Sequence, residues 1–248
     1  MFGAEREYPG ASRMLRALIV DDEPLARDEL ADLLTETGRF TIVGRCGNAV
    51  EALQALRAER PDVLFLDVEM PGISGFELLG MLDEDLHPQI VFVTAHDEFA
   101  VKAFEESAID YLLKPVDGAR LAKTVAKLED PSPRAAPALP ALEITRIPCL
   151  AARAIKLVSV ADVEFVRSSE AGVYVVTASG EFYTELTLAV LEARAHLLRC
   201  HKQYLVNVDR IDEISLADNS LAVIKTKSGK TAPVSRRHLT RLRAALGL

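Results

Sequence analysis

Three continuous apolar runs in the first half of the chain constrain its fold more than any other feature. They are RALIV at 16–20, VLFLD at 63–67 and IVFVT at 90–94, and a polar residue stands at or directly after the end of each. Runs without alternation of polar and apolar residues are typical of strands buried on both faces, as in a parallel sheet covered by helices. We therefore predict an α/β domain built around a parallel sheet.

Segments of helical pattern lie between these runs, and two further short strands are expected at 41–46 and 110–113. Pro24 suits the first turn of a helix and Gly38 suits its end, so we expect the first helix between them. Five strand–helix units with right-handed crossovers form a doubly wound sheet. The predicted helices span 24–37, 48–59, 75–82, 98–107 and 118–128.

A proline-rich segment, DPSPRAAPALPAL at 130–142, divides the chain and contains four of its twelve prolines. Proline removes backbone donors and favours extended conformations, so we predict a semi-rigid Pro/Ala-rich linker. Residues 1–130 hold 26 acidic and 13 basic side chains, whereas residues 131–248 hold 11 and 16. The net charge of −8 therefore averages an acidic and a basic part, which indicates two modules with different partners.

Beyond the linker the pattern changes to short, often alternating runs separated by turn dipeptides such as Ala171-Gly172 and Ser228-Gly229. Such a pattern predicts a mainly antiparallel β domain. The expected strands span 162–169, 173–178, 181–185, 197–206, 211–216, 221–227 and 231–235, and the expected helices span 187–195 and 235–246.

Neither a membrane span nor a signal sequence is expected, because no apolar run approaches the roughly 18 residues that a span requires. Residues 1–13 are expected to form a disordered extension. The three cysteines, Cys46, Cys149 and Cys200, are unclustered and fit buried thiols in a reducing compartment. We therefore expect a cytoplasmic protein that does not insert into the membrane.

Polar side chains gather where the predicted parallel strands end. Asp21 and Asp22 follow the first strand, Asp67 the third, Thr94 the fourth and Lys114 the fifth. Ligand chemistry collects at this edge of a doubly wound sheet. Clustered carboxylates without His or Cys suit a hard cation such as Mg²⁺, and a cation with a lysine can neutralise a transferring phosphoryl group. Asp67 is the candidate nucleophile, and the Thr94 hydroxyl can donate to a phosphoryl oxygen.

The segments LIVDDEPLAR, LFLDVEMPGISG and VFVTAHDEFAVKAFEESAIDYLLKP resemble the receiver domain of bacterial two-component response regulators, over residues 14–129. The resemblance implies a flavodoxin-like fold with strand order 2-1-3-4-5. It also implies a cis bond between Lys114 and Pro115, an isomer that is cheap only before proline.

The resemblance further implies a role for each site residue. Asp67 is the phospho-acceptor, and Mg²⁺ is held by Asp21, Asp22 and Asp67 with the backbone carbonyl of Glu69. Thr94 and Lys114 contact the phosphoryl group. Tyr111 matches an aromatic switch position that turns inward when Thr94 moves.

An aspartyl-phosphate phosphatase of the haloacid dehalogenase type also uses strand-end Asp, Thr and Lys with Mg²⁺. In that class the nucleophile comes first in the chain, a general-acid Asp lies two residues after it, and the acidic pair comes last. Here the pair Asp21-Asp22 comes first, and Glu69 lies two residues after Asp67. Order and residue type both favour a receiver.

Positive charge is concentrated near the C-terminus, where residues 196–248 hold 10 basic and 4 acidic side chains. A localised basic surface is typical of nucleic-acid binding. Other interpretations exist for single residues: Lys225 and Lys227 can protect a sheet edge, and Arg241 and Arg243 can form the solvated face of a helix.

The segments TELTLAVLEA, LLRCHKQYLVNVDRI and VSRRHLTRL resemble the LytTR DNA-binding domain, over residues 143–248. The resemblance implies a mainly β fold that reads DNA through loops. Many family members have His-Arg-Ser where this chain has His201-Lys202-Gln203. Lysine lacks the two-pronged guanidinium, so phosphate contact is favoured for Lys202, while Gln203 can pair with adenine. A structural role is favoured for His201.

A second contacting loop is implied at the 169–174 turn, where Ser169 and Tyr174 are better candidates than the acidic Glu170. The candidate DNA-contacting residues are Lys202, Gln203, Arg236, Arg237, Arg199, Ser169, Tyr174 and His201.

Together these features predict a phosphorylation-activated transcription regulator. A membrane-bound sensor histidine kinase would phosphorylate Asp67, and the protein would then form a homodimer through segments 98–107 and 118–128 and bind repeated sites in double-stranded promoter DNA. No enzymatic turnover is expected beyond slow self-dephosphorylation. The alternatives are a phospho-gated protein-interaction module without DNA binding and a Mg²⁺-dependent aspartyl-phosphate phosphatase.

Overall fold

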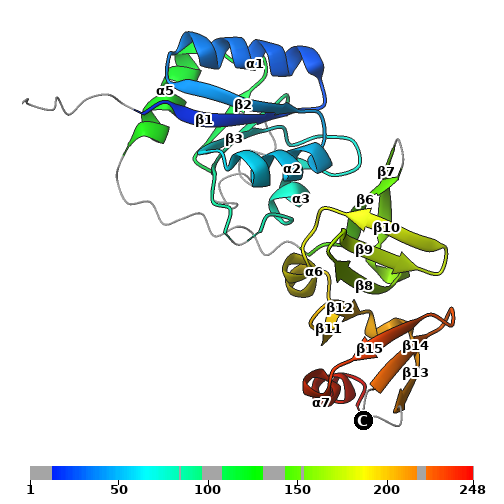
Figure 1. Ribbon diagram of the computed structural model, residues 1–248. Coiled ribbons are helices and arrows are strands. Elements are labelled where there is room, and N and C mark those ends of the chain that lie inside the picture. Colours follow the sequence, from blue (N-terminus) through cyan, green and yellow to red (C-terminus); the bar gives the residue numbers. More distant parts are fainter. Residues whose placement is uncertain are drawn as a thin grey trace, which may run out of the picture. The chain divides into compact units, whose positions relative to one another are not determined.

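The computed structural model describes residues 13–83, 85–96, 108–130, 143–151, 154–216 and 222–247, and the chain forms two compact units (Figure 1). The helix expected at 98–107 lies outside the described residues. So do the expected extension at 1–13 and the linker at 130–142, except for one residue of each. The domain boundaries therefore stay a prediction.

The first unit is built on a five-stranded sheet in which every neighbouring pair is parallel. Its order is β2-β1-β3-β4-β5, which confirms the predicted topology. The strands are β1 (Leu15–Val20), β2 (Phe40–Cys46), β3 (Val63–Leu66), β4 (Gln89–Thr94) and β5 (Asp110–Leu113).

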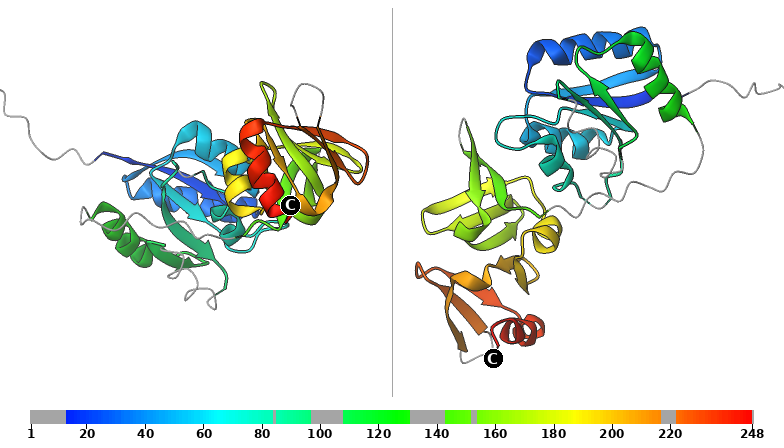
Figure 2. Two further views of the ribbon diagram at one scale, coloured as in Figure 1. Left: turned by 90° about the horizontal axis from the view of Figure 1, so that it is seen from below. Right: turned by 180° about the vertical axis from the view of Figure 1, so that it is seen from behind.

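Helices lie on both faces of this sheet, with α1 and α5 on one side and α2 on the other (Figures 1 and 2). α1 begins at Pro24, and Gly38 just beyond its end has a φ of +65°, which a glycine adopts readily. The helices of the first unit are α1 (Pro24–Glu36), α2 (Ala49–Glu59) and α5 (Gly118–Glu129). α3 (Gly75–Leu79) lies between β3 and β4 in the sequence but belongs to the second unit.

α3 is shorter than the 75–82 expected from the sequence. Ser74 and Glu77 form a reciprocal capping box at its start, whereas the helix ends at Leu79. Gly80 follows, and the low helix propensity of glycine accounts for the early end.

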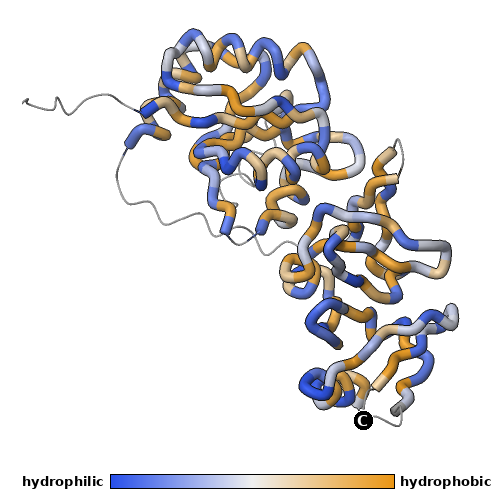
Figure 3. Tube along the Cα trace, viewed as in Figure 1, coloured by the Kyte–Doolittle hydropathy of each residue, from blue (hydrophilic) through white to orange (hydrophobic). Residues whose placement is uncertain are grey.

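The strands of the first unit are apolar because their side chains pack in a core with residues of α1 and α5. Ala17, Ile19, Phe65 and Val91 in the central strands are at most 1% exposed. The hydropathy colouring of Figure 3 follows these strands as apolar segments. Strands covered on both faces expose no side to water, so no polar alternation is required.

The second unit contains two antiparallel sheets. The larger has the order β11-β12-β8-β9-β10-β6-β7, and the smaller has the order β13-β14-β15. The larger is formed by β6 (Arg146–Ala151), β7 (Ala154–Ser159), β8 (Val163–Ser169), β9 (Gly172–Thr177), β10 (Gly180–Thr184), β11 (Leu198–His201) and β12 (Tyr204–Val206). The smaller is formed by β13 (Ile211–Leu216), β14 (Ala222–Thr226) and β15 (Thr231–Val234). The mainly antiparallel β prediction is thus confirmed.

Two details of this unit differ from the sequence prediction. The hairpin of β6 and β7 was not expected, because β7 is an exposed edge strand without regular alternation. The run at 197–206 is not one strand, since Lys202 and Gln203 form a turn between β11 and β12.

Two further helices belong to the second unit, α6 (Leu188–Arg194) and α7 (Arg236–Ala245). Leu242 of α7 packs in a core with Phe165, Val206 and Ile224, which come from both sheets. The three cysteines are buried and free, as expected. No helix within the described ranges has the length and apolar character to cross a membrane.

Candidate phosphoryl site and nucleic-acid interface

The predicted polar cluster is assembled at the carboxyl ends of the parallel strands. Asp21 follows β1, Asp67 follows β3, Thr94 ends β4 and Lys114 follows β5. Backbone hydrogen bonds between neighbouring strands extend to these residues. The Asp67 amide donates to the Val20 carbonyl at 2.8 Å, and the Lys114 amide donates to the Thr94 carbonyl at 2.8 Å. The four side chains therefore come from neighbouring strands at one sheet edge.

The acidic residues form a compact group. One carboxylate oxygen each from Asp21, Asp22 and Asp67 lie within 4.8 Å of one another. Asp21 is 4% exposed and Asp67 is 6% exposed. Burial raises the pKa of Asp21 despite its bond to Lys114, because the charged form loses hydration. Three oxygen donors this close fit a hard divalent cation, which would relieve their mutual repulsion.

Lys114 bridges two of these carboxylates. Its Nζ lies 2.6 Å from Asp21 Oδ2 and 2.7 Å from Asp67 Oδ2. Burial alone would lower the pKa of Lys114, but the bonds to Asp21 and Asp67 outweigh it and the pKa is raised. The ammonium therefore stays charged beside Asp67, where a phosphoryl group would add negative charge.

Backbone amides orient the other carboxylate oxygens. The Glu23 amide donates to Asp21 Oδ1 at 2.9 Å, and the Glu69 amide donates to Asp67 Oδ1 at 3.2 Å. Asp67 Oδ2 therefore faces Lys114, while Oδ1 is held by the backbone amide of Glu69. The role of the Glu69 carbonyl as a metal ligand stays a prediction.

Thr94 and Tyr111 occupy the adjacent strands β4 and β5. Thr94 is fully buried, and within the described part of the chain its hydroxyl oxygen has no hydrogen-bond partner. Tyr111 is 8% exposed, and its hydroxyl donates to the His96 carbonyl oxygen. Tyr111 thus has a buried orientation in this structure. The peptide bond between Lys114 and Pro115 is cis, as expected.

His96 is a neighbour of the site that sequence patterns do not indicate. Besides accepting from Tyr111, it places its Nε2 at 2.8 Å from Glu69 Oε2. It follows β4 by two residues and belongs to no apolar period or strand-end cluster, so only the structure connects it to Glu69.

The second candidate site surrounds the β11–β12 turn. Lys202 and Gln203 are exposed at the turn, and Arg199 NH1 donates to the Lys202 carbonyl at 3.2 Å. His201 accepts from the Gln203 amide at its Nδ1 and stacks edge-on against Tyr204, with ring centroids 5.7 Å apart. His201 thus contributes to the turn itself, in line with the structural role favoured for it.

This turn borders a hollow that we call the basic hollow. The start of α7 is tied to β11, because the Ser235 amide donates to the Cys200 carbonyl at 2.9 Å. Figure 3 shows that α7 is strongly hydrophilic. The hollow is lined by Glu192, Arg199, His201, Lys202, Ser235, Arg237, His238 and Arg241.

The two adjacent arginines of α7 differ in position. Arg237 lines the basic hollow, whereas Arg236 is exposed and does not belong to the described residues that line it. Ser235 and His238 were not predicted; Ser235 Oγ lies 2.6 Å from His238 Nδ1. The three-residue spacing of Ser235 and His238 is only a weak sequence signal for this contact, because serine is a common helix cap whatever follows it. Burial first, and then the charges of Arg237 and Arg199, lower the pKa of His238.

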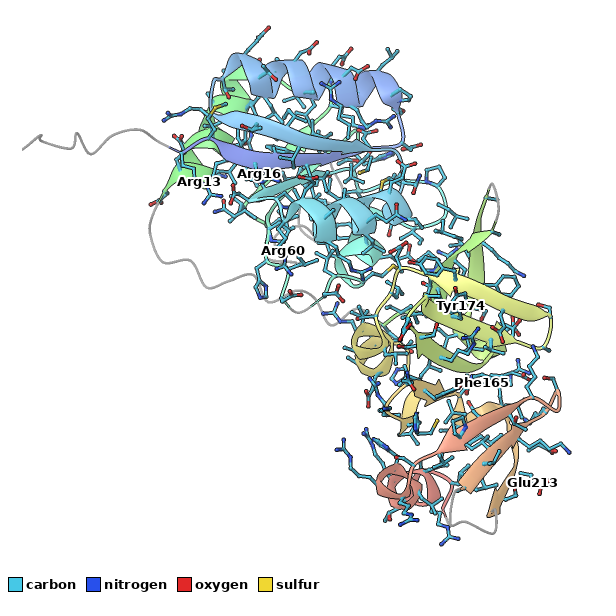
Figure 4. All side chains as sticks on the ribbon, in the orientation of Figure 1. Arg13, Arg16, Arg60, Phe165, Tyr174 and Glu213 are labelled. Carbon is cyan, nitrogen blue, oxygen red and sulfur yellow. The ribbon has the colours of Figure 1, made fainter. Side chains whose placement is uncertain are left out.

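The 169–174 turn lies beside the β11–β12 turn, because the Ser168 amide donates to the Gln203 carbonyl at 2.8 Å. Ser169 is exposed and pairs with Gly172 across the turn. Tyr174 lies on the same sheet (Figure 4), and the guanidinium of Arg167 lies 4.6 Å from its ring centroid. Both predicted loops therefore belong to one surface.

A doubly wound sheet with a carboxylate–lysine cluster, together with a basic β unit, defines a response regulator with a DNA-binding output. Residues 17–126 match the response regulator receiver domain, and residues 153–247 match the LytTr DNA-binding domain. The chain belongs to the LytTR response regulators, which control transcription in a phosphorylation-dependent way.

The chain is similar over nearly its whole length to the transcriptional regulatory protein BtsR. It is 52% identical to BtsR of Escherichia coli K12 over 239 residues, which cover 95% of this chain and 100% of the relative. BtsR of Salmonella typhimurium is 51% identical over 239 residues, with the same coverage. An uncharacterized response regulatory protein of Vibrio cholerae is 49% identical over 240 residues, covering 94% of this chain and 99% of the relative. The similarity over nearly the whole chain places it near the BtsR-like subgroup of the LytTR response regulators.

Proposed function

We propose that Asp67 accepts a phosphoryl group from a phosphohistidine of a membrane-bound sensor histidine kinase, and that the C-terminal unit then binds promoter DNA. One observation carries this proposal: Asp67 is buried beside Asp21 and Asp22, with the charged Lys114 Nζ at 2.7 Å from its Oδ2. This arrangement combines a nucleophile, ligands for a cation and the positive charge of a lysine.

In the transfer, an Asp67 carboxylate oxygen attacks phosphorus in line with the phosphohistidine nitrogen. The new P–O bond forms as the P–N bond breaks, and the electron pair of that bond returns to the imidazole. Asp21, Asp22 and Asp67, with the Glu69 carbonyl, would hold Mg²⁺, which supplies charge neutralisation at the phosphoryl oxygens. Lys114 turns from Asp67 toward the new phosphoryl oxygen.

The acyl phosphate carries about two negative charges in place of the single charge of the Asp67 carboxylate. The Thr94 hydroxyl, which lacks a partner in the described structure, can donate to a phosphoryl oxygen. Movement of Thr94 toward the phosphoryl group biases the position of Tyr111 and the surface around α5 and residues 98–107. Two copies joined through that surface would bind repeated DNA sites with higher avidity. The acyl phosphate would be lost only by slow self-dephosphorylation.

The phosphorylation site is tested with the full chain and a small-molecule phosphodonor such as acetyl phosphate. Asp67→Asn should abolish stoichiometric incorporation, and removal of Mg²⁺ by a chelator should strongly slow it. Asp32→Asn, at an exposed position of α1, is the matched control and should label like the wild type. Continued labelling of Asp67→Asn would refute the assignment. Steady release of phosphate from a monoester would indicate a phosphatase instead.

DNA binding is tested by genome-wide selection of fragments bound by the purified protein, with and without phosphorylation. Lys202→Ala and Arg237→Ala should weaken binding, and Arg236→Ala and Gln203→Ala test the other predicted contacts. Lys225→Ala removes the same charge from the exposed face of β14 and should have little effect. Absence of binding even at low salt would favour a protein-interaction module.

A further inference from the structure

Glu192 brings a negative charge into a surface that is otherwise suited to phosphate. Of the described residues that line the basic hollow, it is the only acidic one. Its Oε2 lies 2.7 Å from Arg199 Nε, and its Oε1 lies 3.5 Å from Arg241 NH1. One carboxylate on α6 therefore contacts arginines from β11 and α7.

A carboxylate in this position opposes DNA phosphates and neutralises arginines that could contact them. Affinity for DNA alone therefore does not explain it. The pair with Arg199 is partly buried, with side-chain exposures of 18% for Arg199 and 27% for Glu192. A charge-assisted bond to Nε in such a place restricts the rotation of the guanidinium.

The restriction extends to the DNA-facing turn. Arg199 donates from NH1 to the Lys202 carbonyl at 3.2 Å while its Nε is bound to Glu192. Glu192 thus supports, through Arg199, the backbone of the turn that presents Lys202 and Gln203. A turn fixed before binding loses less entropy when it meets its preferred bases.

We propose that Glu192 is a positioning residue for DNA specificity, an inference that rests on the proposed DNA-binding function. It holds Arg199 and Arg241 away from indiscriminate phosphate contacts and holds the 202–203 turn in one conformation. It thereby lowers affinity for arbitrary DNA more than affinity for the preferred site, which is how unfavourable charge produces discrimination.

The test uses the full chain and two DNA probes of equal length: the genomic fragment most enriched by the wild type, and a shuffled version of it. Anisotropy titrations over a range of salt should show that Glu192→Ala binds the shuffled probe several-fold more tightly. The slope of log affinity against log salt should steepen by about one to two, because each of the two freed arginines adds roughly one phosphate contact. The ratio of affinities for the two probes should fall about tenfold.

Two control variants keep the effect specific. Glu192→Gln keeps the length and one acceptor oxygen, so it should preserve part of the discrimination. Glu213→Gln removes a charge on β13 (Figure 4). Glu213 is not among the described residues that line the basic hollow, so this variant should leave the ratio unchanged.

A readout without DNA tests the positioning itself. The NMR signal of the Arg199 Nε–H group should be observable in the wild type and lost by rapid exchange in Glu192→Ala. An unchanged signal, or an unchanged affinity ratio, would overturn the inference. An equal loss of affinity for both probes would show a merely structural role and would also overturn it. If the wild type binds both probes with equal affinity, the proposed sequence-specific DNA binding is refuted, and the inference that rests on it is refuted as well.

Discussion

At the scale of single residues, Thr94 combines complete burial with a hydroxyl that has no hydrogen-bond partner among the described residues. A buried unsatisfied polar atom costs about 1–3 kcal/mol, so it is retained for a reason other than stability. The proposed phosphorylation of the neighbouring carboxylate–lysine cluster would supply that reason, because a phosphoryl oxygen there would accept from the hydroxyl.

We predict that Thr94→Val keeps or raises the free energy of unfolding, by up to about 1 kcal/mol, because valine has nearly the same shape and removes the unsatisfied hydroxyl. The same variant should still be phosphorylated at Asp67 but should lose the increase in DNA affinity. Urea unfolding and anisotropy with and without phosphodonor measure the two effects. Thr94→Ser, which keeps the hydroxyl, should retain the coupling; if Thr94→Val responds normally, Thr94 has no part in the switch.

At the scale of elements, α5 is attached to β5 by one buried carboxylate. Asp110 is 1% exposed and accepts from Arg120 at 2.6 and 2.7 Å, from Thr124 Oγ1 at 2.7 Å and from Lys127 Nζ at 2.8 Å. Arg120 also donates to the Tyr111 carbonyl at 2.9 Å. Burial by itself would raise the pKa of Asp110, but these donors outweigh it and the pKa lies below its ordinary value.

A carboxyl group with a lowered folded-state pKa stabilises the fold above its unfolded pKa, and this stabilisation is lost as the pH falls further. We therefore predict that Asp110→Asn lowers the free energy of unfolding by about 2 kcal/mol at neutral pH. The difference from the wild type should shrink below about pH 4, where Asp110 begins to lose its advantage. Urea unfolding over a pH series measures it, with Asp32→Asn as the surface control. A difference that does not depend on pH would contradict the electrostatic explanation.

The turn between β8 and β9 depends on a glycine for two reasons. Gly172 has a φ of +118°, and a Cβ there would lie 2.5 Å from Tyr183 Cε2. Gly229, in the turn before β15, has a φ of +86° but nothing within 4 Å of such a Cβ. The two positions therefore separate backbone strain from steric overlap.

We expect Gly172→Ala to destabilise the second unit by about 2 kcal/mol or more, because strain and overlap add. Gly229→Ala should cost only about 1 kcal/mol. Thermal or urea unfolding compares the two variants. Gly172→Ala should also weaken DNA binding, since it displaces the turn that carries Ser169. Equal losses of stability in the two variants would mean that the Tyr183 ring moves aside without lowering the free energy of unfolding.

At the scale of the whole molecule, the two halves carry opposite net charges and therefore act in opposite ways on DNA. Residues 1–130 hold twice as many acidic as basic side chains, whereas residues 196–248 hold 10 basic and 4 acidic ones. The acidic half repels the same polyanion that the basic end attracts, and the repulsion extends over roughly a Debye length, about 10 Å at moderate salt.

We predict that a fragment of residues 143–248 binds DNA about tenfold more tightly at low salt than the unphosphorylated full chain. The advantage should shrink as salt rises, because added ions screen the repulsion. Anisotropy titrations at several salt concentrations measure it, and circular dichroism confirms that the fragment is folded. A fragment that binds no better than the full chain would refute the repulsion.

The sequence determined the α/β unit and the positions of the candidate phosphoryl-site residues almost completely. Apolar runs without alternation predict parallel strands buried on both faces, and strand order in a doubly wound sheet brings their carboxyl ends together. Asp21, Asp67, Thr94 and Lys114 were therefore placed in one cluster by their positions at strand ends. The physical reason is that backbone pairing of adjacent strands, which depends on local pattern, positions these side chains.

Only the tertiary structure decided the composition of the basic hollow. Glu192, Arg199 and His238 come from three different elements, and no short-range period connects them. Likewise, the turn at Lys202 and Gln203 lies inside a run that the sequence pattern treats as one strand. Side chains from distant segments meet through packing of whole elements, so their contacts depend on the fold of the entire unit, whereas strand ends depend on the sequence around them.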